Sequence, residues 1–277
     1  MRPTSKIILG VFLSIFIISL LFIIGFSFSE RRNYGFRTLN TIYIPQDNPI
    51  GIHVASHRVI VLEVDRTDEQ TEIYPVFNSS GNSLVLNPIT SGEENKLFIP
   101  EALNGFVAVK TNNDTLTIQI KSDEIRKEYD AEIWYNQLHF SGVNFNLYTS
   151  NANVVNKLNG LQTKVRNMVT DSIKIDSRGD ILIESCKAIV IDPMMNQRNY
   201  RLTVKNSIAK IIYLDLDRLN DWKLEKCDIE IENLTGSGRH NITQHRNEKV
   251  KINWRPKNKN AELNIKVPGD TIQIVFQ

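Results

Sequence analysis

The fold of this chain is decided by the stretch DILIESC at residues 180–186. It has two counterparts further along the sequence, which are YRLTVKNS at residues 200–207 and DWKLEKC at residues 221–227. Each stretch has the short apolar pattern that predicts a β-strand. Equivalent apolar residues in the three stretches lie 21 and 20 residues apart, at Ile183, Val204 and Leu224.

A second series of predicted strands lies between the members of the first, at residues 188–192, 210–215 and 228–232, with an earlier copy at 172–176. Its equivalent residues are Ile189, Ile211 and Ile231, spaced by 22 and 20 residues. Two strands per repeat at a period near 20 predict a parallel β-solenoid over residues 141–238, in which stacked rungs share one core. An antiparallel sandwich with evenly spaced strands is the alternative that this spacing leaves open.

The two cysteines, Cys186 and Cys227, stand at equivalent positions of the repeat, two rungs apart. With strands about 4.8 Å apart, their Cα atoms are expected about 9.5 Å from each other. A disulfide requires Cα atoms within about 7 Å. The solenoid therefore predicts two free thiols, and a disulfide between them would contradict this register.

Strands are also predicted on both sides of the repeats. An N-terminal β region, residues 51–140, includes a β-hairpin between residues 105–110 and 115–120, because the Asn112–Asp114 segment suits a tight turn. Residues 239–277 are predicted to supply three capping strands. The fold class is thus all-β, with a parallel β-solenoid-like repeat region, flanking strands, and one transmembrane helix before them.

The predicted transmembrane helix lies near the N-terminus, where no charged residue occurs from Ile7 to Ser29. As a helix, this run reaches about 34 Å, which is enough to cross a hydrocarbon core of about 30 Å. Residues 1–29 are therefore predicted to form a cytoplasmic tail and a membrane anchor, with residues 7–28 in the lipid bilayer and residues 30–50 as a juxtamembrane linker. A cleaved signal peptide is the alternative, although the run is long for one and its end, residues 25–29, is a poor cleavage site flanked by bulky rings.

The orientation of this anchor follows from its flanking charges. Arg2 and Lys6 precede the helix, whereas Arg31, Arg32 and Arg37 follow it, so the positive-inside rule is nearly balanced. The short N-terminal tail needs no translocation, which favours an N-inside orientation. The chain is thus expected to be a single-pass cell-membrane protein whose C-terminal domain is extracytoplasmic, in the periplasm or at the cell surface.

The charge balance bears on possible partners. The chain holds 33 Lys+Arg and 31 Asp+Glu, and only two of the basic residues precede Glu30. A domain of zero formal charge argues against nucleic acid as a partner, because phosphate binding needs a basic excess. One basic cluster stands out, formed by Lys249, Lys251, Arg255, Lys257 and Lys259. It is either a contact for a polyanion, such as a glycan or a lipid headgroup, or a solvated strand edge.

Candidate metal ligands and catalytic groups are sparse. The histidines form two sequence pairs, His53 with His57 and His240 with His245, and neither pair has a third ligand nearby. Five aspartates could be taken for calcium ligands, namely Asp176, Asp180, Asp192, Asp215 and Asp217. Solenoid turns account for them better than a calcium loop does. With no phosphate loop and no nucleophile motif, the sequence predicts no catalytic residue, no cofactor, no metal and no enzyme activity.

Three segments carry a resemblance to a known family. GFVAVK at residues 105–110, NDTLTI at 113–118 and SIKIDSRGDILI at 172–183 resemble the GIN-domain family of bacterial envelope proteins, which are autotransporter adhesin head domains. The resemblance covers about residues 100–235. It implies a right-handed β-solenoid at the cell envelope, with no catalytic residues to carry over.

These observations favour a membrane-anchored envelope protein whose β-solenoid ectodomain is a binding, adhesion or structural module, with an unknown protein or glycan partner. A glycan-active enzyme on a β-solenoid scaffold is one alternative, because solenoid grooves can hold two carboxylates. A membrane-tethered sensor or assembly factor is another.

Overall fold

A computed structural model describes residues 41–65, 74–78, 81–89, 94–131, 137–194, 200–243, 250–266 and 273–276. The chain divides into two units, residues 1–40 and 41–277, and all described residues belong to the second. The predicted anchor at residues 7–28 therefore lies outside the described residues. Within the described segments, no helix is both long and apolar enough to span a membrane.

The described residues form an all-β structure with parallel sheets and one short α-helix. The N-terminal elements are β1 (Thr41–Tyr43), β2 (Ile50–His53), β3 (Val59–Val64), β4 (Tyr74–Phe77), β5 (Ser83–Asn87), β6 (Lys96–Ile99), the 3-10 helix η1 (Glu101–Leu103), β7 (Val107–Asn112), β8 (Thr115–Ile120), α2 (Ser122–Glu128), β9 (Gln137–Ser141) and β10 (Asn144–Tyr148).

The remaining elements are all strands. They are β11 (Ala152–Asn156), β12 (Gln162–Arg166), β13 (Val169–Ser177), β14 (Ile181–Glu184), β15 (Lys187–Asp192), β16 (Tyr200–Lys205), β17 (Ile208–Asp215), β18 (Leu219–Glu225), β19 (Asp228–Gly236), β20 (Arg239–Thr243), β21 (Lys251–Pro256), β22 (Glu262–Lys266) and β23 (Gln273–Phe276).

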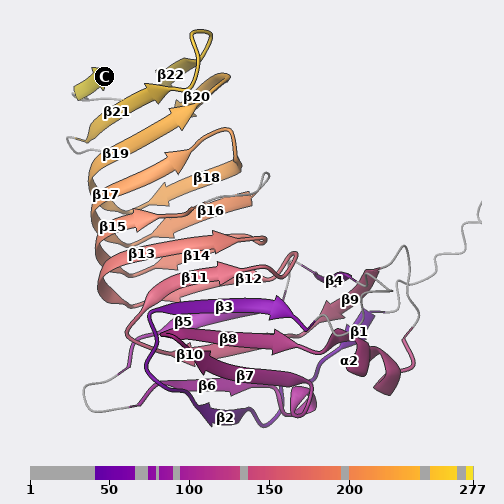
Figure 1. The fold of residues 1–277 in the computed structure, drawn as a ribbon. Helices are drawn as coiled ribbons and strands as arrows, with labels where there is room; N and C mark the ends of the chain where they lie inside the picture. The colour runs from indigo at the N-terminus through magenta and orange to yellow at the C-terminus, as the bar shows by residue number, and fades with distance from the viewer. Residues whose placement is uncertain are drawn as a thin grey trace, which may run out of the picture. The chain divides into compact units, whose positions relative to one another are not determined.

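Two large sheets hold most of these strands. The eight-stranded sheet has the order β18-β16-β14-β12-β5-β10-β6-β2, and the ten-stranded sheet has the order β23-β21-β19-β17-β15-β13-β11-β3-β8-β7. From β12 to β19, a strand of the first sheet is followed by a strand of the second, and we call each such pair a level of the stack (Figure 1). Beyond β19, strands β20 and β22 pair with each other in a separate two-stranded sheet. Antiparallel pairing in the described residues is confined to β2 with β6, β6 with β10, and β7 with β8.

The register of the eight-stranded sheet confirms the first predicted series. Ile183 pairs with Val204, and Val204 pairs with Leu224. The second series was wrong at its first member, because Ile211 pairs with Val190 and not with Ile189. Ala188 and Ile191 both face the core, so the two residues between them, Ile189 and Val190, both turn outward and strict alternation fails there.

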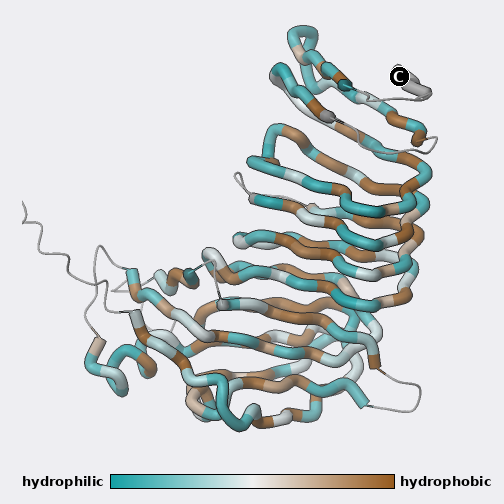
Figure 2. Tube along the Cα trace, turned by 180° about the vertical axis from the view of Figure 1, so that it is seen from behind, coloured by the Kyte–Doolittle hydropathy of each residue, from teal (hydrophilic) through white to brown (hydrophobic). Residues whose placement is uncertain are grey.

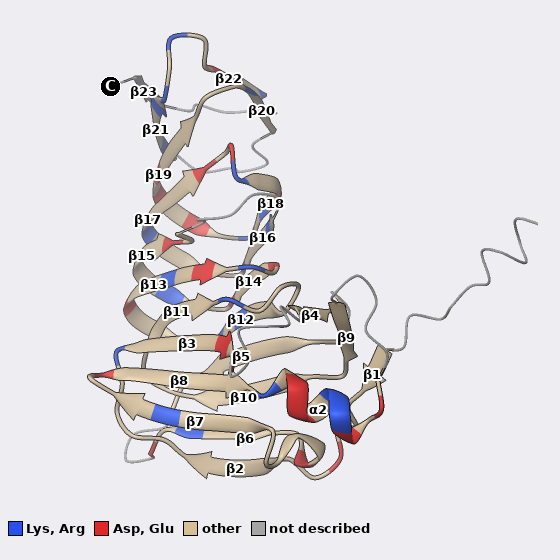
Figure 3. Ribbon diagram, turned by 45° about the vertical axis from the view of Figure 1, so that its right-hand side comes forward, with Lys and Arg blue, Asp and Glu red and all other residues tan. Residues whose placement is uncertain are grey.

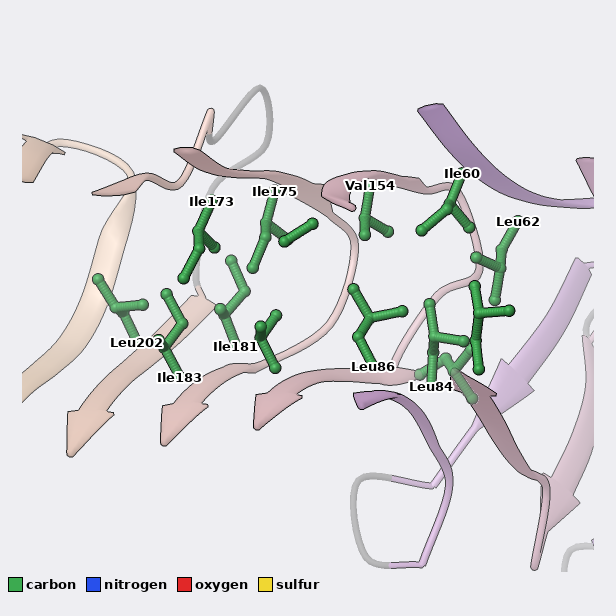
Figure 4. Close-up of a cluster of buried hydrophobic side chains, with 14 of the residues drawn as sticks. Ile60, Leu62, Leu84, Leu86, Val154, Ile173, Ile175, Ile181, Ile183 and Leu202 are labelled. Atoms are coloured by element: carbon green, nitrogen blue, oxygen red, sulfur yellow. The ribbon is translucent and has the colours of Figure 1, made fainter. Parts of the chain in front are cut away.

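The core lies between the two sheets and is almost wholly aliphatic. Figure 4 shows Ile60, Val154 and Ile175 of the ten-stranded sheet facing Leu86 and Ile183 of the eight-stranded sheet. These side chains are fully buried, and each such burial contributes about 1.5–3 kcal/mol to folding. Because the strands are parallel, like positions stack in rows and the core continues from level to level.

At each level the chain passes from the eight-stranded to the ten-stranded sheet through a tight corner. The corner residues adopt left-handed backbone angles, at Asn167 (φ 54°), Ser185 (φ 55°), Asn206 (φ 49°) and Lys226 (φ 51°). Such angles raise the conformational energy only a little for asparagine and more for other residues with side chains. The repeated conformation explains why these corners superimpose along the stack.

The residue after each corner points inward. Cys186 and Cys227 take this position two levels apart, and both thiols are free, as the repeat predicts. The Sγ of Cys186 lies 3.5 Å from the Val165 carbonyl oxygen, and that of Cys227 lies 3.2 Å from the Val204 carbonyl oxygen. Each thiol is thus held against the strand of the preceding level.

Two predictions about the flanks have definite outcomes. The hairpin of β7 and β8 is confirmed, with Asn113 and Asp114 in the left-handed angles that its tight turn requires. The linker predicted at residues 30–50 was too long. Strand β1 pairs with β9, and Ile42 and Ile44 are buried, so residues from Thr41 onward belong to the folded unit.

Candidate functional site: the C-terminal polar cluster and the sheet faces

Charged residues from three turns and strands meet near the C-terminal end of the stack. We call them the C-terminal polar cluster: Asp215, Asp217, Arg218, His240 and Lys257. The Lys257 Nζ atom donates to Asp215 Oδ1 at 2.6 Å and to Asp217 Oδ2 at 3.0 Å. His240 Nε2 lies 3.1 Å from Asp217 Oδ1, and Arg218 Nε lies 3.1 Å from Asp215 Oδ2.

Local packing holds this cluster in place. The Ser237 amide donates to Asp217 Oδ1 at 2.8 Å, and the His240 ring meets the Trp254 ring edge-on at 6.1 Å. A Cβ atom at Gly236 would lie 2.5 Å from His240 Nε2 and 2.9 Å from the Trp254 ring. A larger residue at this position would therefore force one of the two rings to shift.

The cluster keeps its charges fixed. Although burial opposes the shift, the hydrogen bonds from Ser237 and Lys257 hold the pKa of Asp217 well below its usual range. Burial tends to lower the pKa of Lys257, but the hydrogen bonds to Asp215 and Asp217 outweigh it and raise that pKa. These shifts favour the ionised carboxylate and the protonated amine. The pair is therefore suited to a stabilising salt bridge more than to proton transfer.

The structure describes four of the five residues of the predicted basic cluster, and these four do not share one surface. Lys251 and Arg255 lie on the outward face of β21, on the same side of the strand as Asn253, and Lys259 is exposed in the following turn. Figure 3 shows basic residues in this part of the chain. Lys257 instead turns to the aspartates of the polar cluster. Lys249 lies outside the described residues. The basic surface that this part of the chain offers is therefore smaller than the sequence suggested.

The three candidate histidines that the structure describes each have their own partner. His53 Nδ1 lies 3.1 Å from Glu94 Oε2 on the surface. His57 is buried, with its ring nitrogens 3.0 Å from the Ala55 carbonyl oxygen and 3.1 Å from Thr149 Oγ1. Burial lowers the pKa of His57, against a smaller opposing effect of the bond to Ala55. His245, the partner predicted for His240, lies outside the described residues.

The candidate aspartates are likewise dispersed. Asp180 Oδ2 lies 3.3 Å from Arg201 Nε in the next level, and Asp176 sits on the outer face of β13. Burial raises the pKa of Asp192, with Lys174 opposing it. In the segments that the structure describes, no three His, Cys, Asp or Glu residues are grouped in a way that could hold a metal ion.

One surface was missed by the sequence analysis. The outer face of the ten-stranded sheet carries an apolar patch, which comprises Val169, Ile189, Val190, Ile208, Ile211, Tyr213 and Ile231. Figure 2 shows apolar segments recurring from level to level of the stack. Four of these residues are exposed, with 78% of Val169, 51% of Ile189, 49% of Ile208 and 44% of Tyr213 accessible. Only the true register shows which apolar residues face outward.

Comparisons with known proteins give the following. No protein-family model matches the chain, and no curated protein sequence matches it. Among solved structures, a putative adhesin from Bacteroides fragilis has 14% identity and a TM-score of 0.41, over 84% of this chain and 100% of its own. Another from Parabacteroides distasonis has 12% identity and a TM-score of 0.32, over 84% and 100%.

A third solved structure, named as a putative lipid binding protein from Parabacteroides distasonis, has 10% identity and a TM-score of 0.30, over 85% of this chain and 99% of its own. Identities this low, with TM-scores below 0.5, assign neither a family nor a function to this chain.

Proposed function

We propose that this chain is a membrane-anchored envelope protein whose stacked domain is a β-solenoid that serves as a binding and adhesion module. The observation that carries the proposal is the parallel stack itself. Its like positions align from level to level, so outward side chains form long rows on two broad faces. Repeated rows of this kind suit the recognition of an extended or repetitive partner.

The anchor is proposed from the uncharged run at residues 7–28, and it places the stacked domain outside the cytoplasm. An N-terminal anchor also suits a displayed surface, since it leaves the C-terminal levels free to meet a protein or a glycan.

A binding role is favoured over catalysis by the surroundings of the two carboxylates in the C-terminal polar cluster. A glycosidase needs one carboxylic acid that is protonated near neutral pH. The pKa of Asp217 is lowered, and both Asp217 and Asp215 form salt bridges with Lys257. The pair is therefore suited to holding the turn after β17, not to donating a proton.

The proposed ligand contact is the outward face of β21, where Lys251 and Arg255 point the same way. Such residues attract a polyanion through long-range charge, and the attraction falls with salt. We assign Lys259 in the next turn to the same contact, together with Lys249 from the sequence pattern.

Binding of the full chain to dextran sulfate, with neutral dextran as the reference ligand, tests this assignment. The double variant Lys251→Glu with Arg255→Glu is expected to bind at least tenfold more weakly at low salt. The matched control is Lys223→Glu on β18, an exposed lysine of the other sheet, which should leave binding unchanged. The polyanion contact would be ruled out if the chain bound neutral dextran as tightly as dextran sulfate. It would also be ruled out if the double variant bound dextran sulfate as tightly as the wild type.

The anchor has a separate test. Membranes from cells that express the full chain are washed with alkaline carbonate, and intact cells or spheroplasts are treated with protease. The proposal expects the chain to stay with the membrane and the stacked domain to be digested from outside. Release by carbonate, or protection of the domain, would contradict it.

A further inference from the structure

We propose that the free edge of β18 is a docking site for an extended peptide segment, which adds to the eight-stranded sheet as a further parallel strand. The segment that fits has the pattern basic, apolar, any residue, apolar, basic. Strand addition of this kind gives affinity through main-chain hydrogen bonds and specificity through alternate side chains. This second site goes beyond the proposed polyanion contact on β21 and depends neither on that contact nor on the anchor.

The eight-stranded sheet ends at β18, whereas the ten-stranded sheet continues past the same level through β21 and β23. The next strand along the chain, β20, pairs with β22 in a separate sheet (Figure 1). Among the described residues, no strand pairs with the edge of β18 that faces away from β16. An unpaired edge of this kind presents backbone donors and acceptors that can pair with another chain.

The backbone groups on this edge belong to Trp222 and Leu224. The Glu225 carbonyl oxygen accepts a hydrogen bond from the Asn206 amide at 2.9 Å, so the backbone of Glu225 points toward β16. Neighbouring residues of a parallel strand direct their backbone groups to opposite edges. Leu224, and Trp222 two residues before it, therefore direct their N–H and C=O groups to the free edge.

The side chains of the same two residues show that the core is less completely covered at this edge. Trp222 and Leu224 pack against the core but are only partly buried. Their partners on β16, Leu202 and Val204, are fully buried, because strands flank β16 on both sides. A strand added to β18 would place two more apolar side chains in these rows and would remove apolar surface of Trp222 and Leu224 from water.

The charges of an earlier level show how outward residues pair from strand to strand. On β14, Asp180 Oδ2 lies 3.3 Å from Arg201 Nε of the next strand, β16. Glu184 Oε1 on β14 likewise lies 3.9 Å from Lys205 Nζ on β16. The two outward carboxylates of one level are thus paired with two basic residues of the following level. Exposed pairs of this kind add little stability, but they favour one neighbouring sequence over another.

Strand β18 repeats the acidic pattern of β14. Asp221 and Glu225 are exposed on its outward face, each opposite a basic residue of β16 in the register. Neither carboxylate forms an ion pair in the segments that the structure describes. By the pattern of the earlier level, the strand that docks here carries a basic residue opposite each of them. The three residues between those basic positions are then apolar, unrestricted and apolar, as the inward rows require.

The same charges argue against other occupants of this edge. Asp221 and Glu225 repel the anionic groups of a lipid surface or of a polyanion. They also repel a strand with acidic outward residues, and an uncharged strand would leave both without a partner. Charged residues on a free edge limit unselective strand pairing in general. The edge therefore selects a segment in which basic and apolar residues alternate in the stated pattern.

A direct test uses a synthetic peptide with the sequence of residues 200–206, which contains the required pattern as Arg-Leu-Thr-Val-Lys. Fluorescence anisotropy of the labelled peptide measures its binding to the full chain in a mild detergent. The control peptide has glutamate in place of the two basic residues and should bind at least tenfold more weakly. Amide hydrogen exchange over residues 219–225 should slow when the basic peptide binds, because the amides of the free edge become hydrogen-bonded.

Charge exchange identifies the site. The double variant Asp221→Lys with Glu225→Lys should bind the basic peptide at least tenfold more weakly and should bind the acidic control peptide instead. Binding of the acidic peptide also verifies that this variant is folded. The matched control is Asp228→Lys with Glu230→Lys, which reverses two exposed carboxylates on β19 and should bind the basic peptide as the wild type does.

Several results would overturn the proposal. The basic peptide could fail to bind at about 1 mM, the two peptides could bind equally, or the double variant could bind like the wild type. A dimer of the chain alone that is lost in the double variant would assign the edge to a second copy instead.

The polyanion contact is tested separately by the variant Lys251→Glu with Arg255→Glu, which should bind the basic peptide as the wild type does. If dextran sulfate binding fails while peptide binding holds, the site on β18 stands and the polyanion contact fails. The opposite result leaves the polyanion contact and removes the site on β18.

Discussion

Cys186 and Cys227 occupy the same corner of the stack, two levels apart, with Ser207 at the level between them. Strand spacing puts their Cα atoms about 9.5 Å apart, beyond the reach of a disulfide. Both thiols donate instead to carbonyl oxygens of neighbouring strands. Either cysteine or serine therefore fits at this position of the corner.

Peptide mapping without reduction is expected to find both thiols free. In the native protein, iodoacetamide should modify Cys227 faster than Cys186, because Cys186 is buried and burial raises the pKa of its thiol. Ser207 shows that a hydroxyl fits this row, so Cys227→Ser should change the free energy of unfolding by less than about 1 kcal/mol. A Cys186–Cys227 peptide would contradict the register.

The corner at Lys226 is expected to be a site of easy stabilisation. Its left-handed angle strains a long side chain by about 1–2 kcal/mol, and glycine removes this strain at a backbone entropy cost of about 0.5–1 kcal/mol. Lys226→Gly should therefore raise the free energy of unfolding by about 0.5–1 kcal/mol in urea titrations. Lys223→Gly, within strand β18, is the control and should lower it.

Ile191 and Ile189 are near neighbours on β15 that face opposite ways. Ile191 is fully buried, and Ile191→Ala should cost about 2–5 kcal/mol of unfolding free energy. Ile189 is half exposed, and Ile189→Ala should cost no more than about 0.5 kcal/mol. Equal costs would show that the outward assignment of Ile189 is wrong.

The polar cluster predicts part of the acid sensitivity of the fold. The pKa of Asp217 is lower in the folded than in the unfolded chain, where it is about 3.9. Its contribution to stability is therefore full above that value and is lost as the pH falls toward the folded pKa. Asp217→Asn should flatten the fall in stability below pH 5. Asp221→Asn, at an exposed position of β18, should leave the profile unchanged.

The inward rows of the eight-stranded sheet could be predicted because every aligned residue is apolar, as at Ile183, Val204 and Leu224. The inward-facing residues of the ten-stranded sheet were harder to predict. Its strands place two outward residues in succession, and Ile189 is as apolar as the inward Ile191. Hydrophobicity alone cannot say which of the two faces the core.

Charged residues misled the sequence analysis in a different way. Lys257 was grouped with its neighbours in the chain, but its partners are Asp215 and Asp217, which lie on an earlier level. Glu232 is fully buried, and it takes a place in an inward row between Ile212 and Ile252. A glutamate at a core position breaks the binary pattern, so only the pairing register finds it.

The parallel register also dictates how the chain can reach this structure. In the stack, partners are close in sequence, as Ile183 is to Val204, so adding a level closes only a short loop. At the base, Ile60 must find Leu116 and Val154, which is slow. Assembly is thus expected to begin with a slow-closing base and to extend toward the C-terminus, in the order of synthesis. Removing the last levels should leave a folded core, whereas deleting β3 should remove the edge on which β11 pairs and so disrupt the ten-stranded sheet.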